Sequence, residues 1–271
     1  MKKTRIFAAL TAALLALSAL FGCAQEAPKA TDNGNDLLSA IQAKGEIVVA
    51  MEGTWAPWTY HNDNDELVGY DTEVAQAVAE KLGVSASFAE GDFDGLLAGL
   101  EAGRYDIIVN GVEIDESRQE KYDFSAPYGY GHIAVITRAD DDSIQTMEDL
   151  SGKHTANTIT STYAAVAQKY GADVTGVDDL NQTFELLLTG RIDATLNDEF
   201  TYYDYMKAHP DAGIKIACLN PDATQIAIPM RKGDETAALR AAINQALTEL
   251  AEEGKLTELS MKYFDADISQ P

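Results

Sequence analysis

The chain has 271 residues, with 20 Lys and Arg, 44 Asp and Glu and two cysteines. Its net charge of −24 argues against nucleic-acid binding, which needs clustered basic residues, and against attachment to acidic lipid headgroups. Two cysteines cannot build a disulfide-rich scaffold, and His61, His132, His154 and His209 lie far apart without the spacing of a zinc site. We therefore expect a folded protein with no cofactor and no metal site.

The N-terminus has the pattern of a secretory signal peptide over residues 1–22. Basic residues come first, and an almost unbroken apolar run follows over 6–21. Leu20-x-Gly22-Cys23 resembles the lipobox of bacterial lipoproteins, in which the cysteine is lipidated, although Phe21 is bulkier than the small residue usual there. The alternative is ordinary cleavage near Ala24. We expect a lipidated Cys23, followed to residue 36 by a flexible tether rich in Ala, Pro, Asp and Asn.

Two similar runs of strands and helices follow the tether. The first run has a strand at 47–50, a hairpin over 58–68, a helix that Asp71 can cap, a strand at 84–88, a helix around 96–100 and a strand at 105–109. The second run has strands at 154–157, 174–177 and 192–196, with helices over 162–170, 182–189 and 200–208. This alternation predicts an α/β fold with mainly parallel sheets flanked by helices.

A short internal repeat supports two lobes of similar topology. Gly103-Arg104-Tyr105-Asp106 leads through a strand to Asn110, and Gly190-Arg191-Ile192-Asp193 leads through a strand to Asn197. Four matching positions can arise by chance, so the repeat counts only together with the repeated element order. Ligands of open α/β sheets bind beyond the carboxyl ends of the strands. This rule places Asn110-Gly111 of one lobe and Asn197-Asp198 of the other at a shared cleft.

Two features near this cleft are suited to an anion. Asp115 can cap a short helix that carries Arg118 in its first turn, and an arginine can hold a carboxylate through two parallel hydrogen bonds. Alternatively, Arg118 is a surface residue that offsets nearby acids. Ser161 and Thr162 open the next helix, whose free N–H groups also favour an anion. Simple N-capping by Ser161 is the other interpretation, and the two are compatible.

Two acids and an aromatic residue near the strand ends are suited to a cation. Glu113 and Asp198 are natural partners for an ammonium group, although solvated surface acids are common in so acidic a chain. Trp55 can cover an apolar stem or stack on a cation, or can be a core residue, a role that suits Trp58 better. An arginine, a helix N-terminus, two acids and an aromatic cover together indicate a site for a zwitterion such as a free α-amino acid.

Several sequence blocks resemble the solute-binding proteins of polar amino acid ABC importers, known as bacterial extracellular solute-binding protein family 3. The blocks are Gly69-Tyr70-Asp71-Thr72-Glu73-Val74, Tyr122-Asp123-Phe124-Ser125-x-Pro127-Tyr128, Asp149-Leu150-Ser151-Gly152-Lys153, Gly190-Arg191-Ile192-Asp193-Ala194, and Gly254-Lys255-Leu256 with Lys262-Tyr263-Phe264. The resemblance covers about residues 41–268. It implies a type II periplasmic-binding-protein fold with two lobes and a ligand cleft at the hinge. Lobe 1 would comprise residues 37–136 and 226–271, and lobe 2 residues 137–225.

The resemblance also implies ligand roles for particular residues. Trp55 corresponds to the aromatic cover, Arg118 to the clamp on the α-carboxylate, assisted by Thr162 and its neighbours, and Asp198 to the acceptor of the α-ammonium group. Asn110, Gly111 and Glu113 occupy a stretch that contacts the ligand. The family usually has Ser or Thr where Glu113 stands. This second acid could share the α-ammonium group, or could favour a ligand with an additional amine, such as cystine, lysine or arginine.

The leading expectation is therefore an exported, lipid-anchored receptor that works as a monomer. It closes on an amino acid and delivers it to an ABC permease, and it is not an enzyme. A dehydratase of the cyclohexadienyl type on the same scaffold, with Glu113 as general acid, is one alternative. An amino acid-sensing domain is another. The sequence leaves open which amino acid is bound and whether the cell has one membrane or two.

Overall fold

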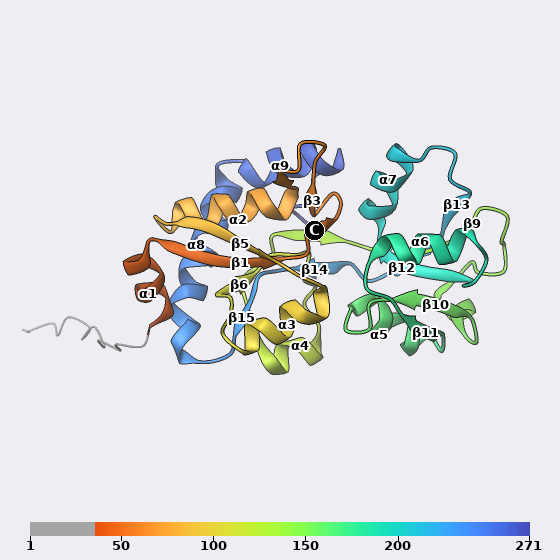
Figure 1. The fold of residues 1–271 in the computed structure, drawn as a ribbon, viewed down its shortest axis with the longest axis horizontal. Helices are drawn as coiled ribbons and strands as arrows, with labels where there is room; N and C mark the ends of the chain where they lie inside the picture. The colour runs from red at the N-terminus through yellow and green to blue at the C-terminus, as the bar shows by residue number, and fades with distance from the viewer. Residues whose placement is uncertain (1–35) are drawn as a thin grey trace, which may run out of the picture. The chain divides into compact units, whose positions relative to one another are not determined.

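The computed structural model describes residues 36–271. The predicted signal peptide, Cys23 and the tether up to residue 35 lie outside the described residues. In the described part, no helix combines the length and the apolar character needed to cross a membrane. The α/β character predicted from the sequence is confirmed, because the described residues form two main sheets, each covered by helices, together with three smaller ones (Figure 1). We call the part around the first sheet lobe 1 and the part around the second sheet lobe 2.

Lobe 1 is built on a parallel sheet with the strand order β5-β1-β6. Its strands are β1 (Glu46–Met51), β5 (Ser85–Glu90) and β6 (Ile107–Ile108). Side chains alternate across the sheet. Val49 therefore joins the core beneath α2 (Tyr70–Lys81), α8 (Ala237–Glu252) and α9 (Lys255–Phe264), whereas Ala50 packs on the opposite face with residues of α3 (Phe93–Glu101). The helices thus cover the sheet from both sides, as the fold requires.

Lobe 1 also contains several smaller elements. They are α1 (Leu37–Lys44), β2 (Thr54–Trp55), β3 (Thr59–His61), β4 (Leu67–Val68), α4 (Glu116–Lys121), β7 (Tyr122–Phe124), β15 (Pro229–Arg231) and η2 (Asp234–Thr236). The predicted hairpin is present as the antiparallel pair β3–β4, with β2 as its third strand. Trp55 ends β2, and Trp58 lies in the turn between β2 and β3.

Lobe 2 contains a five-stranded sheet with the order β11-β10-β12-β9-β13. The strands are β9 (Ile133–Arg138), β10 (His154–Asn157), β11 (Asp173–Gly176), β12 (Ala194–Asp198) and β13 (Ile214–Leu219), and the helices are η1 (Met147–Leu150), α5 (Thr162–Lys169), α6 (Leu180–Leu188) and α7 (Glu199–Ala208). Only β9 runs antiparallel to both of its neighbours, so the sheet is mainly parallel, as predicted.

Two short strands mark where the chain passes between the lobes. β8 (Gly129–Gly131), which precedes lobe 2, pairs with β14 (Thr224–Ile226), which follows it. The boundary expected between residues 136 and 137 falls inside β9, whose partners are β12 and β13. A strand belongs to the sheet that supplies its hydrogen bonds, so the change of lobe comes before Ile133 in this structure. The expected return near residue 226 coincides with the end of β14.

The internal repeat of the sequence corresponds to the same turn in both lobes. Gly103 and Gly190 each follow a helix with a positive φ, +68° and +69°. Three residues later, the carboxylates of Asp106 and Asp193 accept hydrogen bonds from backbone N–H groups of β1 and β10, at 2.8 and 2.9 Å. In each lobe the aspartate ties the turn to the adjacent central strand.

Asp71 does not cap α2, which corrects the expectation from the sequence. Gly69 occupies the capping position with a φ of +128°, and the carboxylate of Asp71 is fully buried. It accepts hydrogen bonds from the backbone N–H of Gly111 and from the Tyr128 hydroxyl, the latter at 2.7 Å. Asp71 therefore connects α2 to the segment after β6, which leads into the cleft.

Candidate functional site

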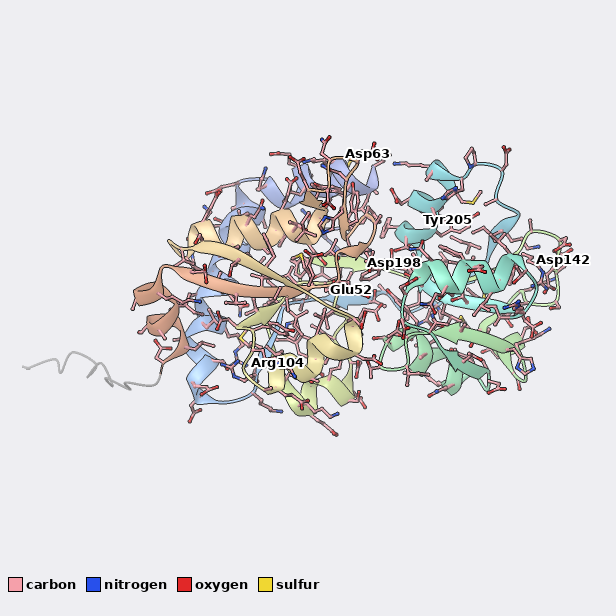
Figure 2. The ribbon with its side chains drawn as sticks, viewed as in Figure 1. Glu52, Asp63, Arg104, Asp142, Asp198 and Tyr205 are labelled. Carbon is pink, nitrogen blue, oxygen red and sulfur yellow. The ribbon has the colours of Figure 1, made fainter. Side chains whose placement is uncertain are left out.

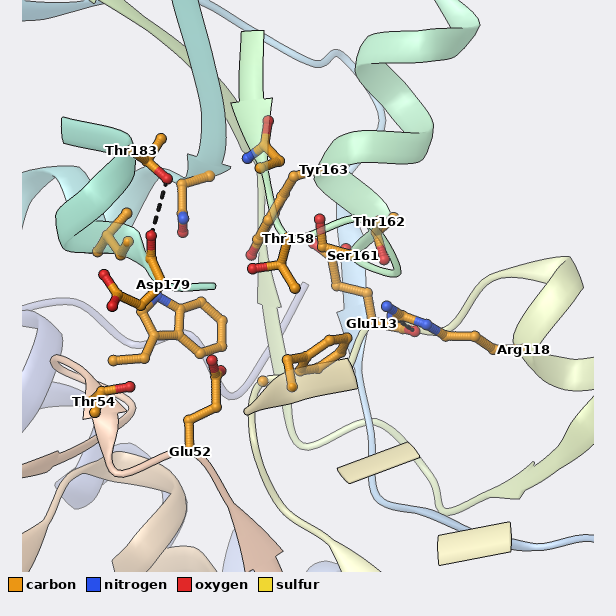
Figure 3. A pocket seen from close by; sticks show the side chains of 16 residues that line it. Glu52, Thr54, Glu113, Arg118, Thr158, Ser161, Thr162, Tyr163, Asp179 and Thr183 are labelled. Atoms are coloured by element: carbon orange, nitrogen blue, oxygen red, sulfur yellow. Dashed lines mark hydrogen bonds between the residues drawn. The ribbon is translucent and has the colours of Figure 1, made fainter. Parts of the chain in front are cut away.

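A pocket lies between the lobes at the carboxyl ends of the central strands (Figure 3). Lobe 1 contributes residues after β1 and β6 together with Phe93 and Arg118, and lobe 2 contributes the ends of β10 and β12 and the first residues of α5 and α6. The lining residues are Glu52, Thr54, Trp55, Phe93, Gly111, Glu113, Arg118, Asn157, Thr158, Ser161, Thr162, Tyr163, Asp179, Leu180, Thr183 and Asn197. This is the location that parallel α/β sheets favour for ligands.

Arg118 is held in place in the wall of the pocket. As predicted, Asp115 caps α4, and its carboxylate accepts from the backbone N–H of Arg118 at 3.0 Å. The guanidinium donates to the carbonyls of Glu113 at 2.9 Å and Thr160 at 3.1 Å, and Nε lies 3.2 Å from Asp115. Described residues thus engage no more than three of its five N–H groups. The remaining donors belong to a buried, pre-oriented side chain, as a carboxylate clamp requires.

Polar groups of lobe 2 face the same region of the pocket. Ser161 caps α5 through a bond from the backbone N–H of Ala164, at 3.1 Å. Thr162 Oγ1 and Asn157 Oδ1 are buried, and neither has a hydrogen-bond partner among the described residues. Buried polar atoms are rarely left unpaired, because each costs desolvation free energy. Both residues line the pocket. A polar ligand would satisfy Asn157 Oδ1, whereas the Thr162 hydroxyl also lies near the Glu113 carboxyl.

Three carboxylates line the pocket: Glu113 is buried, and Glu52 and Asp179 are partly buried. Burial raises the pKa of Glu113 to about 7, although the Thr162 hydroxyl and Arg118 nearby oppose the shift. Burial likewise raises the pKa of Glu52 to about 7, against a hydrogen bond from Asn110. Asp179 caps α6 from lobe 2 and adds to the negative potential at Glu52. A cationic group in the pocket would favour the ionised form of these acids.

Aromatic rings supply the apolar surface between these charged groups. The Trp55 ring packs on Gly111, where a Cβ atom would lie 2.7 Å from the indole carbon Cζ3. Gly111 also has a φ of +53°, so a residue without a side chain is required on both counts. Phe93 lies under the Arg118 guanidinium, with 5.4 Å from Cζ to the ring centroid. Both rings line the pocket and give it apolar surface.

The structure brings together six of the eight ligand-binding residues predicted from the sequence. Those that line the pocket are Trp55, Gly111, Glu113, Arg118, Ser161 and Thr162. Asn110 is fully buried outside the lining, and its side chain bonds to the carboxylate and to the backbone N–H of Glu52, both at 2.7 Å. Asp198 also lies outside the lining and caps α7. Figure 2 shows Glu52 and Asp198 in the central region between the two sheets.

Sequence reasoning missed Glu52, Asp179, Phe93, Asn157 and Tyr163, among other lining residues. Glu52 directly follows β1 and Asn157 ends β10, so the strand-end rule that selected Gly111 could have found them. Asp179 and Phe93 stand at helix starts, where the ordinary interpretation is capping or core packing. Their position in the pocket depends on how the two lobes meet, which no local pattern encodes.

Comparisons with known proteins agree with this geometry. The chain is 37% identical over 238 residues to a probable amino-acid ABC transporter-binding protein of Haemophilus influenzae, covering 88% of this chain and 92% of the relative. It is 34% identical over its whole length to the L-cystine-binding protein TcyA of Bacillus subtilis, which is covered completely.

Two solved structures differ in how well they match. An ancestral arginine-binding protein bound to arginine superposes with a TM-score of 0.75 at 34% identity, covering 81% of this chain and 98% of that one. The unliganded, open L-cystine receptor of Neisseria gonorrhoeae superposes with a TM-score of 0.60 at 38% identity, and the match covers 87% of this chain and 99% of that one. The chain therefore superposes better on the arginine-bound protein than on the open receptor.

The match to the family description extends over residues 47–266, which includes both sheets and every residue that lines the pocket. The fold, the cleft and the relatives lead to one assignment. The chain belongs to the bacterial extracellular solute-binding proteins, family 3.

Proposed function

We propose that this protein captures a free amino acid with a second cationic group, L-cystine or a basic amino acid, and delivers it to an ABC permease. One observation carries the proposal: the same pocket combines the clamp at Arg118 with three carboxylates, Glu52, Glu113 and Asp179. A zwitterion alone needs one positive and one negative contact. Two acids therefore remain as partners for a second ammonium or guanidinium group of the ligand.

The α-carboxylate would bind at Arg118. The free N–H groups of this side chain, the start of α5 and the Thr162 hydroxyl all face one region of the pocket. Charge-assisted bonds from a buried arginine are strong, and its position is already set by the carbonyls of Glu113 and Thr160. Little ordering of the protein is then needed when the ligand binds.

The α-ammonium group would lie near Glu113, with Asp198 adding negative potential from behind the lining. Asp198 already accepts three hydrogen bonds, from Trp58 and from the backbone and hydroxyl of Thr201. Its negative charge is one of the influences that raise the pKa of Glu113. We therefore assign direct contact to Glu113 first, and keep Asp198 as a second acceptor with unused lone pairs.

The distal cationic group would lie between Glu52 and Asp179, which come from different lobes. Asn110 holds the Glu52 carboxylate in one orientation, and the two acids repel each other across the pocket. A cation between them would replace repulsion by attraction, so closure would be favoured for ligands that carry it. The relatives named for L-cystine and the structure bound to arginine both have ligands with such a group.

Isothermal titration calorimetry against L-cystine, L-arginine, L-lysine and the other standard amino acids tests the proposal. We expect submillimolar binding of at least one ligand with a second amine or guanidinium group, and weaker binding of neutral amino acids. Absence of binding tighter than about 1 mM to every ligand would refute the function, because a receptor must concentrate a dilute solute. Turnover of prephenate or arogenate would support the dehydratase alternative instead.

Membership of an extracellular family implies an exported protein. We further propose attachment to the outer face of the cytoplasmic membrane, or within the periplasm, through lipid on Cys23, with the folded part acting as a monomer. The lipobox-like Leu20-x-Gly22-Cys23 supports this proposal. Metabolic labelling with a radioactive fatty acid should mark the wild-type chain and leave Cys23→Ser unlabelled. Equal labelling of both chains would exclude Cys23.

A further inference from the structure

Three hydrogen bonds that involve Trp55, Trp58, Asp198 and Thr201 lie at the start of α7, and two of them join the lobes. Asp198, the last residue of β12, caps this helix by accepting the backbone N–H of Thr201 on Oδ1, at 2.8 Å. Its other oxygen, Oδ2, accepts the Trp58 indole N–H from lobe 1 at 3.2 Å and also the Thr201 hydroxyl. One carboxylate thus serves both the helix and the opposite lobe.

A single hydroxyl extends this connection to the pocket. Thr201 Oγ1 accepts the indole N–H of Trp55 at 3.0 Å while it donates to Asp198. The two indole rings stack with centroids 5.6 Å apart and planes inclined by 27°. Both rings belong to lobe 1, whereas Thr201 and Asp198 belong to lobe 2. The order Trp55, Thr201, Asp198, Trp58 forms a hydrogen-bonded bridge that we call the indole bridge.

The residues of the indole bridge are buried, and most of them lie outside the pocket lining. Trp58 is 0% exposed, Thr201 1% and Asp198 4%. Of its four residues, only Trp55 lines the pocket. Separation of the lobes would remove the acceptors of both indole N–H groups. Unless water replaced them, each donor would remain buried and unpaired, which is unfavourable.

We infer that Thr201 is a positioning residue for ligand binding: its hydroxyl holds the Trp55 ring over the pocket and stabilises the closed arrangement of the lobes without touching the ligand. This inference rests on the proposed function, since it concerns the same cleft. It assigns part of the binding affinity to bonds that form between the lobes. Such bonds exist only when the lobes are shut, so they act mainly on the rate of ligand release.

If Thr201 served only to cap α7, loss of its hydroxyl would leave ligand binding unchanged. Its backbone N–H caps α7 through Asp198 Oδ1, and this bond does not involve the hydroxyl. Thr201→Val therefore keeps the cap and the approximate volume, and removes only the two hydroxyl bonds of the indole bridge. Thr201→Ser restores the hydroxyl. Thr236→Val is a matched control, because this buried threonine bonds only to the carbonyls of Arg231 and Gly233 within lobe 1.

The protein carries its own probe for the experiment. Trp55 and Trp58 are the only two tryptophans of the chain, and both belong to the indole bridge. Acrylamide quenching of the ligand-free protein reports how far the indoles are exposed when the lobes part. Stopped-flow fluorescence with L-cystine and with L-arginine gives the association and dissociation rate constants. Thermal unfolding followed by circular dichroism shows whether each variant is folded.

We expect Thr201→Val to raise quenching in the ligand-free protein and to increase the dissociation rate about tenfold, with little change in the association rate. Thr201→Ser should resemble the wild type, and Thr236→Val should change the unfolding temperature alone. If Thr201→Val does not fold, Trp58→Phe, which removes the second indole donor, should likewise increase the dissociation rate; quenching is not compared for this variant, because Trp58 is one of the two probes.

Unchanged quenching and unchanged dissociation in a folded Thr201→Val variant would overturn the inference. The same holds if Thr236→Val produced equal effects, because the change would then be a general response to a lost buried hydroxyl. Failure of the proposed function is distinguishable: neither ligand would bind the wild type, whereas quenching of the ligand-free variants would still test the indole bridge.

Discussion

Replacement of Arg118 tests the centre of the proposed binding site. The guanidinium is buried, with two of its nitrogens bonded to the carbonyls of Glu113 and Thr160 and the third near Asp115. If it holds the α-carboxylate through two parallel bonds, Arg118→Ala removes both. Hydrogen bonds to charged groups contribute about 1.5–3 kcal/mol each, so the loss is about 3–6 kcal/mol. This corresponds to an affinity about 100-fold to 10,000-fold lower.

Arg118→Lys separates charge from geometry. Lysine keeps the positive charge but cannot form the parallel pair, so we expect an intermediate loss of roughly tenfold to a hundredfold. Arg138→Ala is the matched control. Its guanidinium also donates to backbone carbonyls, those of Leu187 and Ile192, but these lie in lobe 2 and outside the pocket lining.

Calorimetry with the ligand identified for the wild type measures these differences, and thermal unfolding of each variant checks that the fold persists. A dissociation constant for Arg118→Ala within about threefold of the wild-type value, in a folded protein, would refute the carboxylate assignment. An equal loss in Arg138→Ala would show that the effect is not local to the pocket.

Three further predictions follow from the acids and from one glycine. Burial raises the pKa values of Glu52, Asp71 and Glu113 to about 7, above those of an unfolded chain, so the native state holds more protons between about pH 4.5 and 7. The unfolding temperature of the ligand-free protein should therefore fall as the pH rises from about 5 to about 8, and a flat or rising profile would contradict this. Glu52→Gln should weaken binding of L-arginine or L-cystine about tenfold while leaving L-glutamine binding nearly unchanged, as competition calorimetry would show; equal losses would argue against a distal cation site. Gly69→Ala should destabilise the protein by about 2–4 kcal/mol in urea unfolding, because φ is +128° and a Cβ atom would collide with the Trp58 carbonyl; a loss under about 0.5 kcal/mol would be incompatible with that geometry.

Local sequence patterns were sufficient for most of the elements and for the position in the cleft of the residues proposed to bind a carboxylate. Arg118 was predictable because Asp115, three positions earlier, caps its helix, and because both residues follow a strand end. Ser161 was predictable for a similar reason. Capping and strand ends involve residues that are near each other in the chain, so the sequence carries the information directly.

The same rules were less successful for Asn110 and Asp198. Both stand near strand ends, as expected, but the side chain of Asn110 turns to Glu52 and that of Asp198 turns to Trp58 and Thr201. A strand end places a residue at the edge of the sheet. The direction of its side chain there depends on which donors and acceptors other segments bring close.

The sequence by itself determined the family, the alternating α/β order and the positions of the strand ends that face the cleft. Only the tertiary structure decided which acids share the pocket, and that Trp58 meets Asp198 from 140 residues away. Local order follows from short-range sterics, caps and hydrophobic periodicity. The site depends on how the two lobes meet, and that contact is set by the packing of residues that no local pattern relates.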